Sequence, residues 1–246
     1  MASLFSRARL ATLSKLAAGT AVAVPTGFYF WTRRCVFDDG FSPATDPVFQ
    51  HPFLKTVNPR GNPVFHDSYV RTVPFDDIRP DLLEDALDGG SRLVETYSAG
   101  VWGRYGFNAQ RKILEMARKN EANAGDLWGK EDLLRSTYQY VSQLTSAGTI
   151  LADDFIVVDK SPGSLMLRGG LSPRVAPDGP RELDTICNLT TELDPQTRVA
   201  RFALQSLVLD GVSEGKAAPL GGVAVFLHQQ YAKLLLTAGV DHCIAS

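Results

Sequence analysis

The most regular alternation of hydrophobic and polar residues lies between residues 149 and 209, and it predicts two consecutive β-hairpins. The first begins with residues 149–158, a run rich in the β-branched and aromatic side chains that suit a pleated, half-buried surface. Pro162 and Gly163 then indicate a turn, because proline presets φ and glycine accepts a positive φ. Residues 165–168 are the expected return strand.

The second predicted hairpin has strands at 184–193 and 198–209, joined by a turn at 194–197. The more apolar face of its second strand is expected to pack against the core. That face carries Ala200, Phe202, Leu204, Ser206 and Val208. Four such strands make a sheet that holds together when a helix covers one face.

The remaining elements are one strand and several helices, and the helices are predicted from helical spacing of apolar residues. A first strand is expected at 64–73, helices in more than one piece at 78–120, and a further helix at 126–144, with a strand at 138–141 as the alternative for its later part. The last helix is expected over 223–238, with Gly239 as the residue that stops it. Its apolar face carries Val223, Phe226, Leu227, Gln230, Tyr231, Leu234 and Leu235.

This order of elements predicts an α+β domain in which an antiparallel β-meander packs on helices, including a C-terminal helix. It is compatible with a helix-grip-like arrangement, in which a curved sheet wraps a long terminal helix, and with a hot-dog-like arrangement. Folds of this kind enclose a cavity between sheet and helix. The fold alone does not fix the function.

Composition narrows the class of protein. The chain has 246 residues and a net charge of −2, from 25 basic and 27 acidic residues, so one domain with an appendage is expected and nucleic acid is not an expected partner. The three cysteines, Cys35, Cys187 and Cys243, lie far apart, which predicts neither a disulfide framework nor a metal centre.

The N-terminal segment, residues 1–36, contains no acidic residue and has the basic and serine content of a mitochondrial targeting segment. Within it, Leu16 to Trp31 is an apolar run that ends in aromatic residues and is followed by Arg33 and Arg34. Such a run favours a single membrane anchor with an interfacial aromatic belt. A cleaved secretory signal and a cleaved mitochondrial presequence are the alternatives. Charge lies on both sides, so topology is undecided.

Residues 37–63 are rich in proline and lack a hydrophobic period, which is typical of a linker. Such a segment either wraps the surface or lifts the domain off a membrane. The expected domains are therefore the anchor at 1–36, the linker at 37–63 and the globular domain at 64–246.

Three segments carry a resemblance to known proteins: Gly148-Thr149 through Asp153-Asp154-Phe155, Arg168-Gly169-Gly170 with Ser172-Pro173, and Leu227-His228-Gln229-Gln230-Tyr231. Together they resemble an uncharacterised family of small fungal membrane-anchored proteins, over roughly residues 60 to 240. The resemblance implies a place in fungal specialised-metabolite pathways or in a mitochondrial membrane, and it brings no catalytic residues. Asp154 stands where the pattern has histidine.

The candidate catalytic residues are Asp154 and His228. Asp153 and Asp154 form an acidic pair inside an apolar strand, where only one of them can face the interior. A carboxylate in an apolar cavity has a raised pKa and can act as acid or base. His228 and Tyr231 are neighbours on one face of the last helix and can both point into the cavity. The alternatives are a solvated pair of aspartates and a rim position for the histidine.

Four further residues complete the candidate site list. Arg168 is a candidate anchor for a ligand carboxylate, although an ordinary surface arginine has the same appearance. Trp102 and Tyr105 belong to the densest aromatic and glycine cluster, which indicates either a ligand site or a tight corner. Asn188 heads a glycosylation sequon that matters only in the secretory lumen. No nucleotide-binding, nucleophile-elbow or zinc-protease motif is present, so no cofactor is expected.

Two functions from different classes fit this sequence. The first is a membrane-anchored protein that handles a small apolar molecule, as a carrier or as a cofactor-free tailoring enzyme. The second is a non-catalytic assembly or scaffold protein of the mitochondrial membrane, whose interior is filled and whose Pro-rich stretch makes the contacts. An open cavity lined by Asp154, Arg168 and His228 would favour the first function.

Overall fold

The structure is a computed structural model, and it describes residues 25–135, 148–214 and 219–245. The chain divides into two compact units, Met1–Arg34 and Cys35–Ser246. In the first unit residues 25–32 are helical. The part of the expected Leu16–Trp31 anchor that precedes Pro25 lies outside the described residues. Within the described ranges, no helix is both long enough and apolar enough to cross a membrane.

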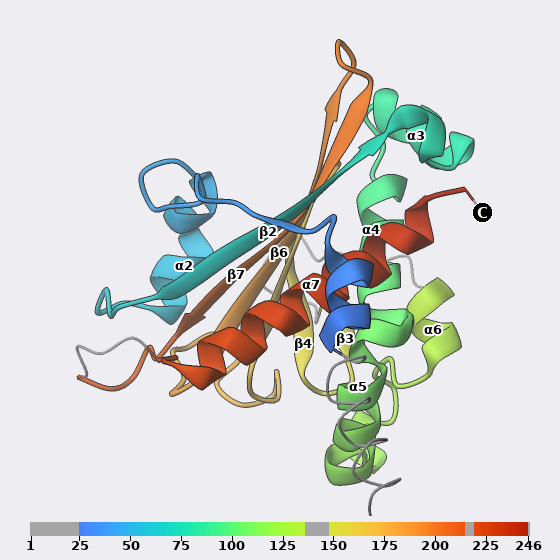
Figure 1. The fold of residues 1–246 in the computed structure, drawn as a ribbon. Helices are drawn as coiled ribbons and strands as arrows, with labels where there is room; N and C mark the ends of the chain where they lie inside the picture. Colours follow the sequence, from blue (N-terminus) through green and yellow to red (C-terminus); the bar gives the residue numbers. More distant parts are fainter. Residues whose placement is uncertain (1–24, 136–147, 215–218, 246) are drawn as a thin grey trace, which may run out of the picture. The chain divides into compact units, whose positions relative to one another are not determined.

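The second unit is α+β and is built on one antiparallel sheet (Figure 1). Its strands have the spatial order β1-β2-β7-β6-β5-β4-β3. They are β1 (Val36–Phe37), β2 (Phe65–Pro74), β3 (Ile150–Leu151), β4 (Phe155–Ser161), β5 (Ser164–Gly169), β6 (Asp184–Asp194) and β7 (Val199–Leu209). The strands from β3 to β7 pair consecutively, so the predicted meander is confirmed. The first long strand, β2, pairs with the last one, β7.

The predicted strand at 149–158 is wrong in one respect. The chain turns sharply between β3 and β4, because Ala152 and Asp153 have φ values of 52° and 49°. A hydrophobic pattern of period two does not detect this left-handed turn, since Ala152 and Asp153 are as buried as the strand residues beside them. Aspartate tolerates this conformation better than most residues. Asp153 and Asp154 therefore lie in a turn.

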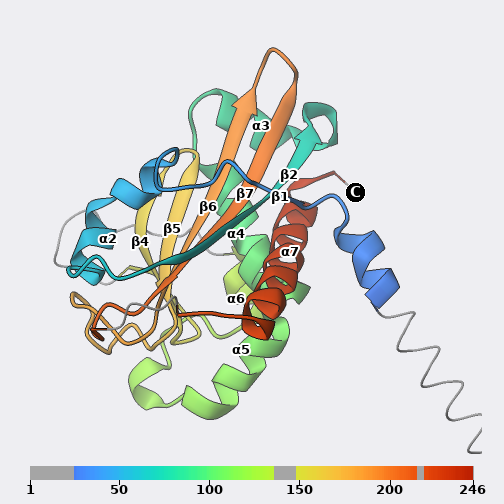
Figure 2. The same ribbon diagram turned by 60° about the vertical axis from the view of Figure 1, so that its left-hand side comes forward.

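After β2, the helices of the second unit come from two parts of the chain. The group between β2 and β3 comprises α3 (Pro80–Leu87), α4 (Arg92–Gly103), α5 (Tyr105–Arg118) and α6 (Lys130–Arg135), and α7 (Val223–Cys243) comes last. Short 3₁₀ turns lie at Phe75–Asp77 and Glu121–Asn123. The predicted helix at 126–144 is observed only as α6, and its later part lies outside the described residues. Figures 1 and 2 show α4 and α7 on one face of the sheet.

The two helices α4 and α7 cross at glycines. A Cβ atom added at Gly100 would lie 2.5 Å from Cβ of His242 and 2.8 Å from the carbonyl oxygen of Gly239. The prediction that Gly239 stops the last helix is wrong, because α7 continues to Cys243. Gly239 instead lets the backbones approach, since its own Cβ would meet the ring of Tyr97 at 2.5 Å.

The other face of the sheet is covered by the segment that was expected to be a linker. Residues 37–63 contain η1 (Pro47–Gln50) and α2 (Pro52–Val57), and each begins with a proline at the first helical position, where its missing N–H costs nothing. This segment packs on the outer face of the sheet (Figure 2). The second small core formed there contains Phe41, Val48, Val57, Met166, Ile186, Leu207 and Leu209. The expected boundary at residue 63 is therefore wrong, and the compact unit begins at Cys35.

Candidate active site in the cavity under the last helix

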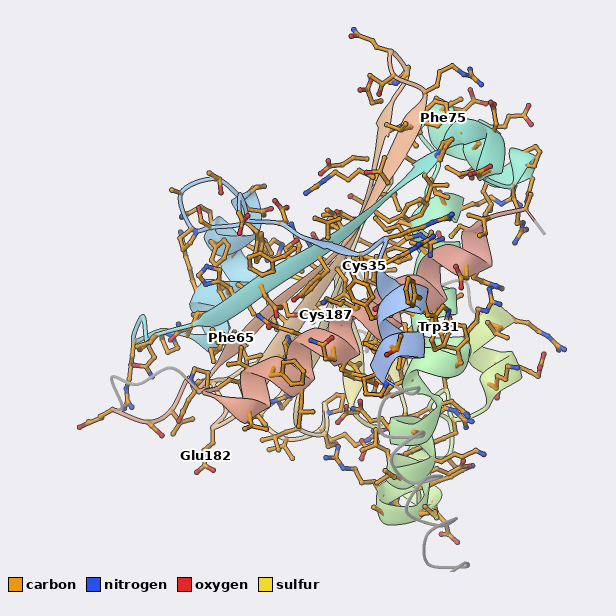
Figure 3. All side chains as sticks on the ribbon, in the orientation of Figure 1. Trp31, Cys35, Phe65, Phe75, Glu182 and Cys187 are labelled. Carbon is orange, nitrogen blue, oxygen red and sulfur yellow. The ribbon has the colours of Figure 1, made fainter. Side chains whose placement is uncertain are left out.

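A cavity of about 340 Å³ lies between the helix-covered face of the sheet and the helices α4, α5 and α7. The floor is the sheet, because every second row of cross-strand partners on β6 and β7, such as Cys187 and Ser206, points toward the helices. Figure 3 labels Cys187, one of these floor residues, beside α7. The lining residues are Trp102, Gln110, Leu114, Arg118, Asp154, Phe155, Gly170, Thr185, Cys187, Leu204, Ser206, His228, Tyr231, Ala232 and Leu235.

Four of the six candidate catalytic and ligand-binding residues line this one cavity, namely Asp154, His228, Tyr231 and Trp102. They come from the β3–β4 turn, from α7 and from the end of α4. The other two, Arg168 and Tyr105, do not line it. Segments that are far apart in the sequence therefore supply the polar groups of one site.

The first polar cluster of the cavity is centred on the carboxylate of Asp154. Arg118 donates to Oδ1 of Asp154 over 2.9 Å, and the side-chain amide of Gln110 donates to Oδ2 over 3.1 Å. The hydroxyl of Tyr231 donates to the amide oxygen of Gln110 over 2.8 Å. Gln110 lies in the second turn of α5 and Arg118 is its last residue, so α5 links the turn at Asp154 to α7. Sequence analysis missed Gln110 and Arg118.

Burial dominates the electrostatics of this cluster. Removal from water raises the pKa of the Asp154 carboxyl, and the charge and hydrogen bond of Arg118 oppose that effect. The pKa of the Tyr231 hydroxyl is also raised, by burial and then by the negative charge of Asp154. Tyr231 is thus a neutral hydroxyl, and Asp154 is a carboxylate that accepts a proton more readily than one in water. An arrangement of this kind can accept a proton from, or donate a hydrogen bond to, a ligand.

The second polar cluster is the pair formed by His228 and Asp67. Nε2 of His228 lies 3.2 Å from Oδ1 of Asp67, whose side chain is 1% exposed. The other carboxylate oxygen, Oδ2, has no hydrogen-bond partner among the described residues. Asp67 lies opposite Ser206 on β7, and Ser206 lies opposite Cys187 on β6. Burial raises the pKa of the Cys187 thiol to about 12, so the thiol is protonated at neutral pH.

Asp67 holds the imidazole ring, and the ring lines the cavity. A buried carboxylate beside a ring nitrogen fixes the orientation and the tautomer of a histidine. His66 and Asp67 are neighbours on β2, and neighbouring residues of a strand point to opposite faces of the sheet. They do diverge: His66 contacts the rings of Phe41 and Phe49 on the outer face. The partner of Asp67 is His228 of α7, which is far away in the sequence and lies beside β2 only in the folded chain.

Arg168 serves the structure, and the interpretation as a ligand anchor is wrong. Its side chain is 1% exposed, and it makes a bidentate ion pair with Asp184 at 2.6 and 2.7 Å. Its remaining donors reach the carbonyl oxygens of Ala176, Pro177 and Gly179. All five N–H groups are therefore used inside the protein, and none is left for a ligand.

Three other candidates also have structural roles. The hydroxyl of Tyr105 donates to Oδ2 of Asp241 over 2.8 Å, at the corner between α4 and α5. Asp153 accepts from Ser172 and Arg174, so it ties the β3–β4 turn to the loop after β5. Asn188 is 6% exposed and donates to Gln205 over 2.7 Å in the middle of the sheet. A glycan at Asn188 would disrupt this sheet, so the sequon is not an acceptor in the folded domain.

Over the described ranges, no three histidine, cysteine or acidic side chains come together as metal ligands. The cysteines are unpaired and buried. Comparison of the chain with protein families, with curated proteins and with solved structures finds no match. The resemblance to fungal membrane-anchored proteins thus remains a prediction, and the observation that bears on function is the cavity.

The raised pKa of Asp154 predicts a stability that depends on pH. A raised folded-state pKa means that protonated Asp154 stabilises the fold, and this stabilisation is lost as the pH rises from the unfolded value near 3.8 through the folded value. Asp154→Asn should therefore be more stable than the wild type at pH 7, and the difference should vanish in acid. Thermal unfolding of the full chain between pH 3 and 8 measures this, because the range runs from below the ordinary aspartate pKa of about 3.9 to well above it.

Asp194 provides the control of opposite sign. Hydrogen bonds from Thr197 and Gln196 lower the pKa of Asp194, so its contribution is present at neutral pH and is lost in acid. Asp194→Asn should lower the unfolding temperature at pH 7 and not in acid. Equal signs for the two variants would show that Asp154 is not in a desolvating environment.

Proposed function

We propose that the unit from Cys35 to Ser246 binds a small, largely apolar molecule in the cavity under α7, as a carrier or as a cofactor-free tailoring enzyme. The observation that carries the proposal is an open cavity of about 340 Å³ with apolar walls and two buried polar clusters. Ligand sites typically have this size and this combination of apolar lining with a few placed polar groups.

In the enzymatic form of the proposal, Asp154 and His228 exchange protons with the ligand. The raised pKa of Asp154 makes its carboxylate a better proton acceptor than an aspartate in water, and Tyr231 and Gln110 orient a polar group of the ligand. Asp67 acts on His228, as a positioning residue. In the carrier form, the same groups recognise a polar end of the ligand and the apolar wall holds the rest.

We further infer a helix-grip-like arrangement in preference to a hot-dog-like one. Support comes from the strand order, in which β2 lies beside β7, with helices inserted after β2 and a long helix after β7. A single-pass anchor at residues 16–31, a mitochondrial membrane, with the endoplasmic reticulum as the alternative, and a role in fungal specialised-metabolite biosynthesis remain parts of the proposal that rest on the sequence. Tagged chains with and without residues 1–36 test the location.

The alternative, an assembly or scaffold protein, predicts a filled interior and a Pro-rich contact surface. The segment 37–63 packs against its own sheet, and Asp154 and His228 line an open cavity. Both observations favour ligand binding.

Filling the cavity tests the proposal. Ala232 is 2% exposed and lines the cavity from α7, so the ring in Ala232→Phe should occupy the space that a ligand needs. We expect wild-type protein to be stabilised against heat by one class within a panel of fatty acids, sterols and polyketides, with quenching of Trp102 fluorescence. The ligand affinity derived from either effect should be at least about tenfold lower in Ala232→Phe, a difference equivalent to about 1.4 kcal/mol.

The matched control places the same ring on the surface. Ala109 is exposed on α5, so Ala109→Phe should bind as the wild type does. The proposal fails if no compound stabilises the wild type, or if Ala232→Phe binds as well as Ala109→Phe does.

A further inference from the structure

The two polar regions of the cavity differ in how completely their hydrogen bonds are made. At Asp154, Arg118 and Gln110 each donate to one carboxylate oxygen. Tyr231 in turn donates to the amide oxygen of Gln110. The acceptors of this first cluster are therefore satisfied by the protein itself, and a ligand gains little by replacing those bonds.

The floor of the cavity carries polar groups whose hydrogen bonds are not made. Asp67 lies opposite Ser206 and Ser206 lies opposite Cys187, so the three side chains form one row across β2, β7 and β6. Ser206 and Cys187 line the cavity, and Figure 3 labels Cys187. Within the described parts of the chain, neither the hydroxyl of Ser206 nor Oδ2 of Asp67 has a hydrogen-bond partner. Asp67 and Ser206 are only 2% and 3% exposed, and burial makes an unmade hydrogen bond costly.

The strand register places the hydroxyl of Ser206 within reach of the Asp67 carboxylate. Cβ atoms of directly opposite residues in an antiparallel pair are about 4.5–5.5 Å apart, so rotation of the Ser206 side chain can bring its hydroxyl to Oδ2. A carboxylate only accepts hydrogen bonds, so Ser206 would be the donor and would keep its own lone pairs for a ligand. The floor therefore presents an acceptor to the cavity.

His228 adds a second acceptor beside this row. Its Nε2 lies against Oδ1 of Asp67, and in the neutral ring the nitrogen that faces a carboxylate carries the proton. The other ring nitrogen, Nδ1, is then an acceptor. Because Asp67, Ser206 and His228 all leave acceptors over, a ligand that donates a hydrogen bond fits this end of the cavity best.

We propose, building on the proposed function, that the ligand is an apolar alcohol whose hydroxyl donates to Oγ of Ser206 while Ser206 donates to Oδ2 of Asp67. A fatty acid fits poorly, because its ionised carboxylate has no donor and is repelled by the charge of Asp67. An ether of the same size has no donor either and leaves Ser206 without a partner. An ammonium group donates, but burying its charge costs far more hydration than burying a hydroxyl.

The size of the cavity selects the probe molecules. A cavity of about 340 Å³ has room for about eleven groups of the size of a water molecule, each taking about 30 Å³. Decanol has this number of non-hydrogen atoms, and methyl nonyl ether is its isomer without a donor. Isothermal titration calorimetry of the full chain with decanol, methyl nonyl ether, decanoic acid and decylamine compares the four polar groups on nearly the same apolar chain.

We expect decanol to bind most tightly, at least about fivefold more tightly than methyl nonyl ether, because only decanol completes the bond to Ser206. In Ser206→Ala this preference should disappear, with the ether binding as it does to the wild type. Ser68→Ala is the matched control, since Ser68 is the neighbour of Asp67 on β2 and points to the opposite face of the sheet. Its hydroxyl is also buried without a partner, so both variants remove the same kind of group, and Ser68→Ala should keep the preference for decanol.

The outcomes separate this proposal from ligand binding itself. Equal affinities for decanol and the ether, or a preference that survives in Ser206→Ala, would overturn the proposal and leave ligand binding in place. Tightest binding by decanoic acid or decylamine would overturn it as well and would identify an anionic or a cationic ligand. Binding by none of the four compounds would contradict the proposed function, and the alcohol proposal would fall with it.

Discussion

Replacing Arg168 by methionine is expected to lower the free energy of unfolding by about 3–5 kcal/mol, the range for removal of one partner from a buried ion pair. Asp184, the partner, is fully buried, so its charge would lose the bidentate contact without access to water. Three carbonyl oxygens of the loop 176–179 would lose their donor at the same time. Urea unfolding of the full chain, followed by circular dichroism, measures the loss.

Arg135→Met is the control for this prediction. Arg135 and Glu131 form an ion pair on α6 in which both side chains are mostly exposed, 80% and 66%, and such pairs contribute about 0.3–0.5 kcal/mol. If Arg168→Met lowers the free energy of unfolding no more than Arg135→Met does, Arg168 does not hold the loop 176–179. A role as a ligand anchor would then be favoured again.

Gly100→Ala is expected to destabilise the second unit by about 1–3 kcal/mol, the usual cost of an extra methyl group in a packed interior. In a helix, alanine is more favourable than glycine by roughly 0.5–1 kcal/mol. Helix propensity alone would therefore make Gly100→Ala stabilising, and the expected loss of stability has the opposite sign. The cause is the overlap of the new methyl group with the backbone of α7 at Gly239, which cannot move as a side-chain end can. The same urea unfolding measures it.

Gly125→Ala separates this effect from a general effect of glycine replacement. A Cβ atom at Gly125 would meet nothing within 4 Å, and Gly125 does not have a positive φ. We expect a change of about 0.5 kcal/mol or less there. A neutral or stabilising Gly100→Ala would mean that α4 and α7 do not cross at this point.

Much of the sheet could be predicted from the sequence, because alternation is a local signal. The hairpin of β6 and β7 has its turn after Asp194, as the polar residues there indicate, and β2 was expected within one residue of its observed bounds. Local sequence patterns failed where a residue has a role that depends on burial or on packing against a distant element. Ala152 and Asp153 satisfy a turn and a buried position together, and Gly239 satisfies a close helix crossing instead of a helix end.

The site could be predicted only in part, for a related reason. Asp154, His228 and Tyr231 were candidates because their residue types are unusual in apolar surroundings. Gln110 and Arg118 resemble ordinary exposed helix residues, and only the packing of α5 against the β3–β4 turn places them on Asp154. Arg168 was a plausible ligand anchor until its five donors could be assigned. Partners separated by a long stretch of chain are not visible in a local pattern.

The central claim is that the space between the sheet and α7 holds a small molecule. Native mass spectrometry of the full chain, released gently from mild detergent, tests it most directly, because it weighs what the protein retains. The account predicts that wild type and Ala109→Phe carry the same additional mass of one small apolar molecule, and that Ala232→Phe carries none. Bare protein in all three cases, after incubation with the stabilising ligand class, or equal retention by Ala232→Phe, would contradict it.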